Sequence, residues 1–137
     1  MKKNLLLTLM LSLTTTAALG HEGHDHDAPT TLEAPKGGTI KALELTLVEV
    51  VSKGKDLKIY LYDKAMKPQA VAAYAVKATA QPPRGKNSEE VKLAAKGTWF
   101  EGSYDAKGLH RYTLVVAIKD PKTGHDDKLN FTVEPRK

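Results

Sequence analysis

The chain contains 137 residues, of which 41% are hydrophobic, with no cysteine and five histidines. This length and composition predict one domain with a hydrophobic core and argue against wholesale disorder. The lack of cysteine excludes a disulfide scaffold, thiolate metal sites and a cysteine nucleophile.

Residues 1–20 have the layout of a cleaved secretory signal peptide. Lys2 and Lys3 provide positive charge, residues 5–13 are largely apolar, and Ala18 and Gly20 occupy the −3 and −1 positions of a small-residue cleavage site. The apolar run is shorter than the roughly 20 residues that cross a bilayer, and no later run is longer. We therefore expect a protein that is exported to the bacterial periplasm and does not insert into the membrane after cleavage.

Cleavage near Gly20 changes the charge balance. The formal charge of +5 falls to +3, because Lys2 and Lys3 leave with the leader. Residues 21–27 carry three acidic and no basic side chains. Residues 28–137 therefore carry 19 basic and 13 acidic side chains, a net charge of +6. Its lysines are spread along the chain without the dense basic block of a nucleic-acid-binding protein, so no nucleic-acid partner is expected.

The mature chain divides into a polar start and a strand-rich body. Residues 21–27 cannot pack a core, and residues 28–38 are interrupted by Pro29, Pro35 and a glycine pair, which is typical of a linker. We therefore predict a histidine-rich flexible tail and linker over residues 21–38, followed by a β-sandwich domain over residues 39–137.

The body begins with an apolar run over residues 40–51. Leu43, Leu45 and Leu47 share one face of an extended chain, but Val48 and Val50 then take the apolar positions. This change of phase predicts one strand with a bulge or bend.

Later runs alternate in hydrophobicity at the spacing of a sandwich. The alanine-rich segment 69–80 has some helical propensity, but its valines and closing prolines favour a strand. The prediction is an all-β, immunoglobulin-like antiparallel β-sandwich of about seven strands. The predicted runs are residues 40–51, 57–62, 71–80, 89–95, 98–104 and 109–119, and a last run containing Leu129, Phe131 and Val133.

Three of the five histidines cluster in the tail. His21, His24 and His26 form a His-x-x-His-x-His segment, interspersed with acids. Neutral imidazole is a common ligand for copper, zinc and nickel, and carboxylates can complete such a site. The segment therefore predicts capture of a divalent transition-metal ion, Cu(II) or Zn(II), although a solvated leader would have the same composition. The predicted ligands are His21, His24 and His26, supported by Glu22, Asp25 and Asp27.

The cleavage point decides whether a tighter copper site can form. Cleavage after Gly20 makes His21 the terminal residue, so its amine and imidazole can chelate one ion together. Cleavage after Ala18 abolishes this chelate but retains the three imidazoles.

The other two histidines are weaker candidates. His110 shares the phase of the following strand, and a rim histidine bonded to backbone is the simpler interpretation. His125 precedes Asp126 and Asp127, a cluster that either holds a cation or is an exposed polar turn. The run 109–119 separates the two histidines by roughly 30 Å at about 3.3 Å per residue, so they cannot share an ion.

Aromatic residues offer one further candidate surface. Tyr60 and Tyr62 share a strand face with Lys58, and with Trp99 or Tyr104 they could form a ligand patch, although core packing or cross-strand pairing explains them equally well. There is no serine–histidine–acid pattern or phosphate-binding glycine loop, so we do not expect an enzyme.

Three segments together resemble small exported proteins that are associated with heavy-metal efflux. They are Ala34-Pro35-Lys36-Gly37-Gly38-Thr39-Ile40, the Leu43-to-Val51 run, and Leu57-Lys58-Ile59-Tyr60-Leu61-Tyr62-Asp63. The resemblance covers roughly residues 21–75. It implies a periplasmic immunoglobulin-like domain that handles copper or zinc beside an efflux pump. The N-terminal histidine is also similar to that of small copper-resistance β-barrel proteins, but no internal histidine here clearly matches their second ligand.

The leading hypothesis is thus a periplasmic accessory protein that sequesters or hands over Cu(II) or Zn(II), with an efflux component as its partner. The alternative is an envelope interaction module, whose sandwich edge or aromatic face docks on another protein while the tail is incidental.

Overall fold

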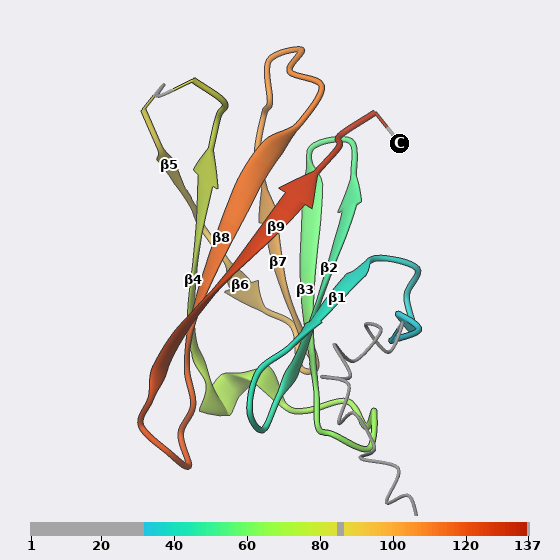
Figure 1. Ribbon diagram of the computed structural model, residues 1–137, viewed down its shortest axis with the longest axis vertical. Helices are drawn as coiled ribbons and strands as arrows, with labels where there is room; N and C mark the ends of the chain where they lie inside the picture. Colours follow the sequence, from blue (N-terminus) through green and yellow to red (C-terminus); the bar gives the residue numbers. More distant parts are fainter. Residues whose placement is uncertain (1–31, 85–86, 137) are drawn as a thin grey trace, which may run out of the picture. The chain divides into compact units, whose positions relative to one another are not determined.

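The computed structural model describes residues 32–84 and 87–136. These residues form two antiparallel β-sheets that pack face to face (Figure 1). One sheet has the strand order β1-β2-β3-β7-β6 and the other the order β5-β4-β8-β9. The strands are β1 (Thr39–Ala42), β2 (Leu47–Lys53), β3 (Asp56–Tyr62), β4 (Ala75–Gln81), β5 (Glu89–Val91), β6 (Ala94–Ala95), β7 (Trp99–Ser103), β8 (Tyr112–Lys119) and β9 (Asp126–Val133).

This arrangement confirms the predicted all-β, immunoglobulin-like sandwich. The orders β2-β3-β7-β6 and β5-β4-β8-β9 match the A-B-E-D and C′-C-F-G sheets of that fold, and β1 adds one strand at the edge beside β2. Among the described residues, no helix is long and apolar enough to cross a membrane.

The core lies between the two sheets, because alternate residues of each strand point inward. Ile59 and Leu61 of β3 belong to the same core cluster as Leu114 and Val116 of β8, and all four side chains are fully buried. Phe131 of β9 is also fully buried and packs in the same cluster.

Nine strands are present among the described residues instead of about seven, because two predicted strands are each divided. The run 40–51 is a hairpin, in which β1 and β2 are joined by a turn where the Leu43 N–H donates to the Thr46 carbonyl at 2.7 Å. The predicted bulge was therefore wrong, and Leu45 is 44% exposed in that turn. The run 89–95 supplies β5 to one sheet and β6 to the other.

The alanine-rich segment 69–80 contains both a short helix and a strand. Residues Val71–Ala73 form a short 3-10 helix (η1), and β4 follows from Ala75. The strand prediction is confirmed for β4, whereas the first predicted residues are helical.

Candidate functional site

The predicted metal-binding tail lies outside the described residues. His21, Glu22, His24, Asp25, His26 and Asp27 all precede residue 32.

The two remaining histidines lie at opposite ends of the sandwich. His110 is exposed in the loop that precedes β8, and His125 is exposed in the loop between β8 and β9. The eight residues of β8 separate these loops by roughly 25 Å at about 3.3 Å per residue. The prediction that the two histidines cannot share an ion is confirmed.

The His125-Asp126-Asp127 segment spans the start of β9, which begins at Asp126. The His125 N–H donates to Thr123 Oγ1 at 3.3 Å, and the His125 carbonyl accepts the Asp120 N–H at 3.1 Å. Asp126 and Asp127 are successive strand residues, so they point to opposite faces of the sheet. Within residues 32–84 and 87–136, no group of three or more histidine, aspartate or glutamate side chains is placed to hold a metal ion.

The most specific polar arrangement of the described residues surrounds Glu49 on the outer face of β2. Its side chain is 0% exposed. Glu49 Oε1 accepts the backbone N–H groups of Lys36 and Gly38, each at 2.9 Å, and Oε2 accepts the Tyr62 hydroxyl at 2.8 Å. Three donors thus compensate the burial of one carboxylate. We call Glu49, Tyr62 and residues 36–38 the Glu49 anchor.

Local backbone geometry explains the glycine pair within this anchor. Gly37 has a φ of +74°, which lets the amides on either side of it converge on one anion. Gly38 lies so close to β2 that an added Cβ would be 2.2 Å from the Val50 carbonyl oxygen. The last residues of the predicted linker are therefore held against the sheet, and the boundary predicted at residue 39 falls beside this anchored segment.

Sequence reasoning did not find the anchor. Glu49 lies between Val48 and Val50, so alternation places it on the outer face, where a charged residue is ordinarily solvated. Its partners lie 11 to 13 residues away in sequence and two of them are backbone amides. The feature of the sequence that could have indicated the anchor is the Gly37-Gly38 pair, because adjacent glycines mark a tight backbone conformation.

Three of the aromatic residues of the predicted patch, Tyr60, Tyr62 and Trp99, lie together on the same outer face, whereas Tyr104 does not. Tyr60 lies between Tyr62 and Trp99, with ring centroids 6.5 and 6.0 Å apart respectively. Lys36 lies 5.7 Å above the Tyr60 ring, and Lys58 lies 5.9 Å above the Trp99 ring. Tyr60 and Trp99 are half-buried and Tyr62 is only 2% exposed, so the exposed part of the group is limited to Tyr60 and Trp99.

Tyr104 belongs to the core instead. It packs edge-on against Tyr112 with ring centroids 4.6 Å apart. Burial raises the pKa of Tyr112 to about 12, and burial also raises the pKa of Tyr104. Burial of Tyr62, followed by its hydrogen bond to Glu49, raises the pKa of that phenol far above its usual value.

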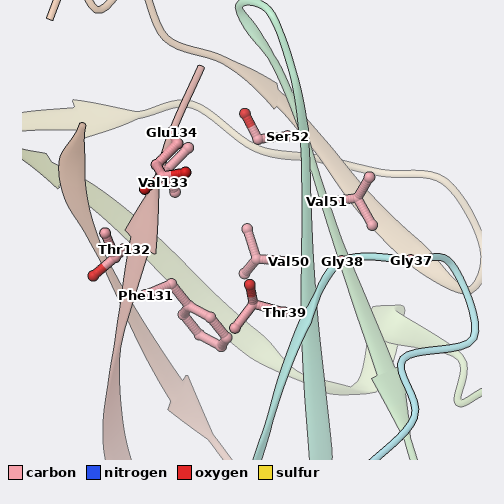
Figure 2. Close-up of a pocket in the computed structure, with 10 residues that line it drawn as sticks. All are labelled: Gly37, Gly38, Thr39, Val50, Val51, Ser52, Phe131, Thr132, Val133 and Glu134. Carbon is pink, nitrogen blue, oxygen red and sulfur yellow. The ribbon is translucent and has the colours of Figure 1, made fainter. Parts of the chain in front are cut away.

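A groove opens where the edges of the two sheets meet. It has a volume of about 480 Å³ and separates β2 from β9. Figure 2 shows Val50 and Ser52 extending from β2 toward β9, while Phe131 extends back toward Val50 and Thr39. We call this cavity the seam groove. Its lining residues are Gly37, Gly38, Thr39, Val50, Val51, Ser52, Phe131, Thr132, Val133 and Glu134.

Comparison with known proteins adds no relative, since no family model, curated protein or solved structure matches the chain.

Proposed function

We propose that this protein is a periplasmic metal-binding accessory protein that sequesters or hands over Cu(II) or Zn(II), in connection with heavy-metal efflux. The observation that carries the proposal is the His21-x-x-His24-x-His26 segment, which follows the small-residue end of the leader. Three imidazoles and three carboxylates within the seven residues 21–27 are nitrogen and oxygen donors that suit borderline divalent ions.

The chemistry of these donors determines the expected selectivity. The mature chain has no cysteine and a single methionine, Met66, so soft sulfur ligands for Cu(I) are scarce. At nitrogen and oxygen sites Cu(II) binds more tightly than the other divalent first-row ions. We therefore expect Cu(II) to displace Zn(II) from the tail.

In this proposal the role of the sandwich domain is to hold the tail at a fixed attachment point. Residues 36–38 are fixed to β2 through the buried Glu49 carboxylate, so the chain enters the domain at a defined point on the outer face. Truncating the tail ahead of this anchor should leave the fold unchanged. Uptake by the tail can thus be measured separately from folding.

Calorimetric titration with Cu(II) and Zn(II) tests the proposal. The mature protein should bind metal, and a version that begins at Ala28 should not. The matched control replaces both histidines of the sandwich, His110→Gln with His125→Gln, and should bind as the mature protein does. Uptake that survives in the Ala28 version, or that disappears in the control, would contradict the proposal.

The N-terminal residue decides the geometry of the site. Mass spectrometry of the exported protein identifies this residue directly. A chain that starts at His21 supports chelation by its terminal amine and imidazole. Any other start excludes this chelate and leaves the three imidazoles as the nitrogen ligands.

A further inference from the structure

A second cavity opens at one end of the four-stranded sheet, where β4 ends, β8 begins and β9 ends. These three strands are neighbours in the sheet (Figure 1). The cavity has a volume of about 340 Å³, which lies at the small end of the range of small-molecule pockets. We call it the Arg111 pocket. Its lining residues are Gln81, Pro82, Pro83, Arg111, Tyr112, Thr113 and Thr132.

Three neutral polar side chains of this pocket form a row across the three strands. Thr113 of β8 lies opposite Gln81 of β4 on one side and opposite Thr132 of β9 on the other. Paired residues of antiparallel strands share a face, and this is the outer face, because the alternate residues Tyr112 and Leu114 are buried in the core. Two strand spacings of about 4.8 Å make the row about 10 Å long. The pocket thus presents an amide and two hydroxyl groups in a line.

The polar side chains of the pocket are accessible to a ligand. Gln81, Arg111 and Thr132 are exposed, and Thr113 is half-buried. None of these four side chains has a hydrogen-bond or ion-pair partner within residues 32–84 and 87–136. A ligand therefore displaces only water from them and breaks no contact of the fold.

The charge of the pocket selects the ionic group of the ligand. Of the described residues that line the pocket, only Arg111 is charged, and Glu134 lines the seam groove instead. A guanidinium presents a planar pair of N–H donors that matches the two oxygens of a carboxylate. One cation also balances the single charge of a carboxylate, whereas a phosphate dianion would keep one uncompensated charge.

Two prolines provide the apolar side of the pocket. Pro82 and Pro83 directly follow β4, and their rings offer C–H surface without an N–H donor. A ligand with one carboxylate, several hydroxyl groups and a C–H face would match all of these contacts. A sugar ring that carries a carboxylate combines the three features on a rigid frame, so it loses little conformational entropy on binding.

We propose that the Arg111 pocket binds a uronic acid, a sugar ring that carries one carboxylate. Arg111 pairs with the carboxylate, the row of Gln81, Thr113 and Thr132 hydrogen-bonds the hydroxyl groups, and Pro83 packs against the C–H face of the ring. This site does not rest on metal binding by the tail.

A peptide that ends in a carboxylate fits the pocket less well. The central strand β8 is paired with β4 on one side and with β9 on the other. Its backbone groups are therefore used within the sheet, and a peptide lying on this face would find no backbone partners for its own amides.

The test titrates isotope-labelled mature protein, without added metal, with D-glucuronate and follows the amide resonances by NMR. We expect saturable shifts centred on Arg111, Thr113, Thr132 and the side-chain amide of Gln81, with a dissociation constant of about 1–10 mM. D-Glucose lacks the carboxylate and acetate lacks the hydroxyl groups, so each should bind at least about tenfold more weakly. No saturation at about 100 mM glucuronate, or shifts centred outside the pocket, would overturn the proposal.

Two further probes separate the alternative ligands. N-acetylglycine carries a carboxylate on a peptide unit, and D-glucose 6-phosphate carries a phosphate on the sugar. Each should bind at least about tenfold more weakly than glucuronate. Binding of either probe as tight as that of glucuronate would overturn the assignment to a uronic acid.

Substitutions of Arg111 test its contact with the carboxylate. Arg111→Gln should weaken glucuronate binding at least about tenfold. Arg111→Lys should weaken it about threefold or more, since lysine keeps the charge but lacks the planar pair of donors. The matched control, Arg136→Gln, removes the same charge from a residue that lines a different cavity and should change the affinity less than about twofold. Equal affinities of the two glutamine variants would contradict the role of Arg111.

Thr113→Val distinguishes a ligand contact from a structural effect, because it replaces a hydroxyl by a methyl group of similar size. The affinity for glucuronate should fall about threefold to tenfold, whereas the affinity for acetate should not change, since acetate reaches only Arg111. A structural defect in the pocket would weaken both ligands equally. An equal loss for both ligands, or no loss for glucuronate, would overturn the hydroxyl contacts.

Discussion

Replacing Glu49 by alanine removes the acceptor on which three buried or half-buried donors depend. The amides of Lys36 and Gly38 lose Oε1 at 2.9 Å, and the Tyr62 hydroxyl loses Oε2 at 2.8 Å. Each donor that stays buried without a partner costs about 1–3 kcal/mol, but the anchored segment can move and admit water. We therefore expect Glu49→Ala to lower the free energy of unfolding by about 3–5 kcal/mol.

Glu49→Gln separates the hydrogen bonds from the charge. The amide oxygen of glutamine can accept from the two backbone amides, and its NH₂ group can donate to a reoriented Tyr62 hydroxyl. The bonds are then neutral and weaker, so we expect a loss of about 1–2 kcal/mol. Glu90→Ala on β5 is the control, because Glu90 is exposed and should change stability by less than about 0.5 kcal/mol.

Chemical denaturation monitored by circular dichroism measures these differences. For a domain of this size, Glu49→Ala should also lower the melting temperature by at least about 12 °C. Hydrogen exchange should accelerate at the Lys36 and Gly38 amides of the alanine variant. An alanine variant within about 1 kcal/mol of the wild type, with unchanged exchange at both amides, would refute the anchor.

The remaining predictions concern the glycine pair, the buried tyrosines and the tail. Gly38→Ala should destabilise the domain by at least about 2 kcal/mol, because its Cβ would lie 2.2 Å from the Val50 carbonyl oxygen. Gly54→Ala is the control, since its Cβ would meet no atom within 4 Å; it should cost about 1–2 kcal/mol, because the residue keeps a left-handed φ. Denaturation curves of the two variants compare them, and equal losses would contradict the contact. Burial raises the pKa of Tyr112 to about 12, above the unfolded value of about 10, so its contribution to stability is complete below about pH 10 and is lost as pH rises through about 12. Urea midpoints between pH 9 and 11.5 should therefore fall less steeply in Tyr112→Phe than in Tyr60→Phe, and equal slopes would count against this assignment. Metal uptake by the tail should weaken below about pH 6, because protons compete for imidazoles with pKa values near 6.5, and titrations at pH 5.5 and 7.5 with equal affinity would exclude imidazole ligands.

The fold was predictable from sequence because alternation along single strands reports which face is buried. Alternation within the runs 57–62 and 109–119 indicates the inward positions of β3 and β8, such as Ile59 and Leu114, which are fully buried. Strand division was harder to predict. Only two residues separate Val91 at the end of β5 from Ala94 at the start of β6, and hydrophobicity does not show that the chain changes sheets between them.

The polar features depend on contacts between distant residues, which a single sequence does not display. Glu49 resembles an ordinary solvated acid until residues 36–38 fold over it. The seam groove likewise requires Ser52 and Thr132, 80 residues apart in the numbering, to face each other across the edge. The metal-binding tail is the reverse case, since three closely spaced histidines can form a site from local sequence alone.

Electron paramagnetic resonance of the mature protein with one equivalent of Cu(II) tests the central claim most directly. Nitrogen hyperfine couplings from imidazole should appear, should persist in the His110→Gln, His125→Gln control, and should diminish when His24 and His26 are both replaced by glutamine. A nitrogen pattern that remains unchanged in the version beginning at Ala28 would show that the metal binds elsewhere and would contradict the account.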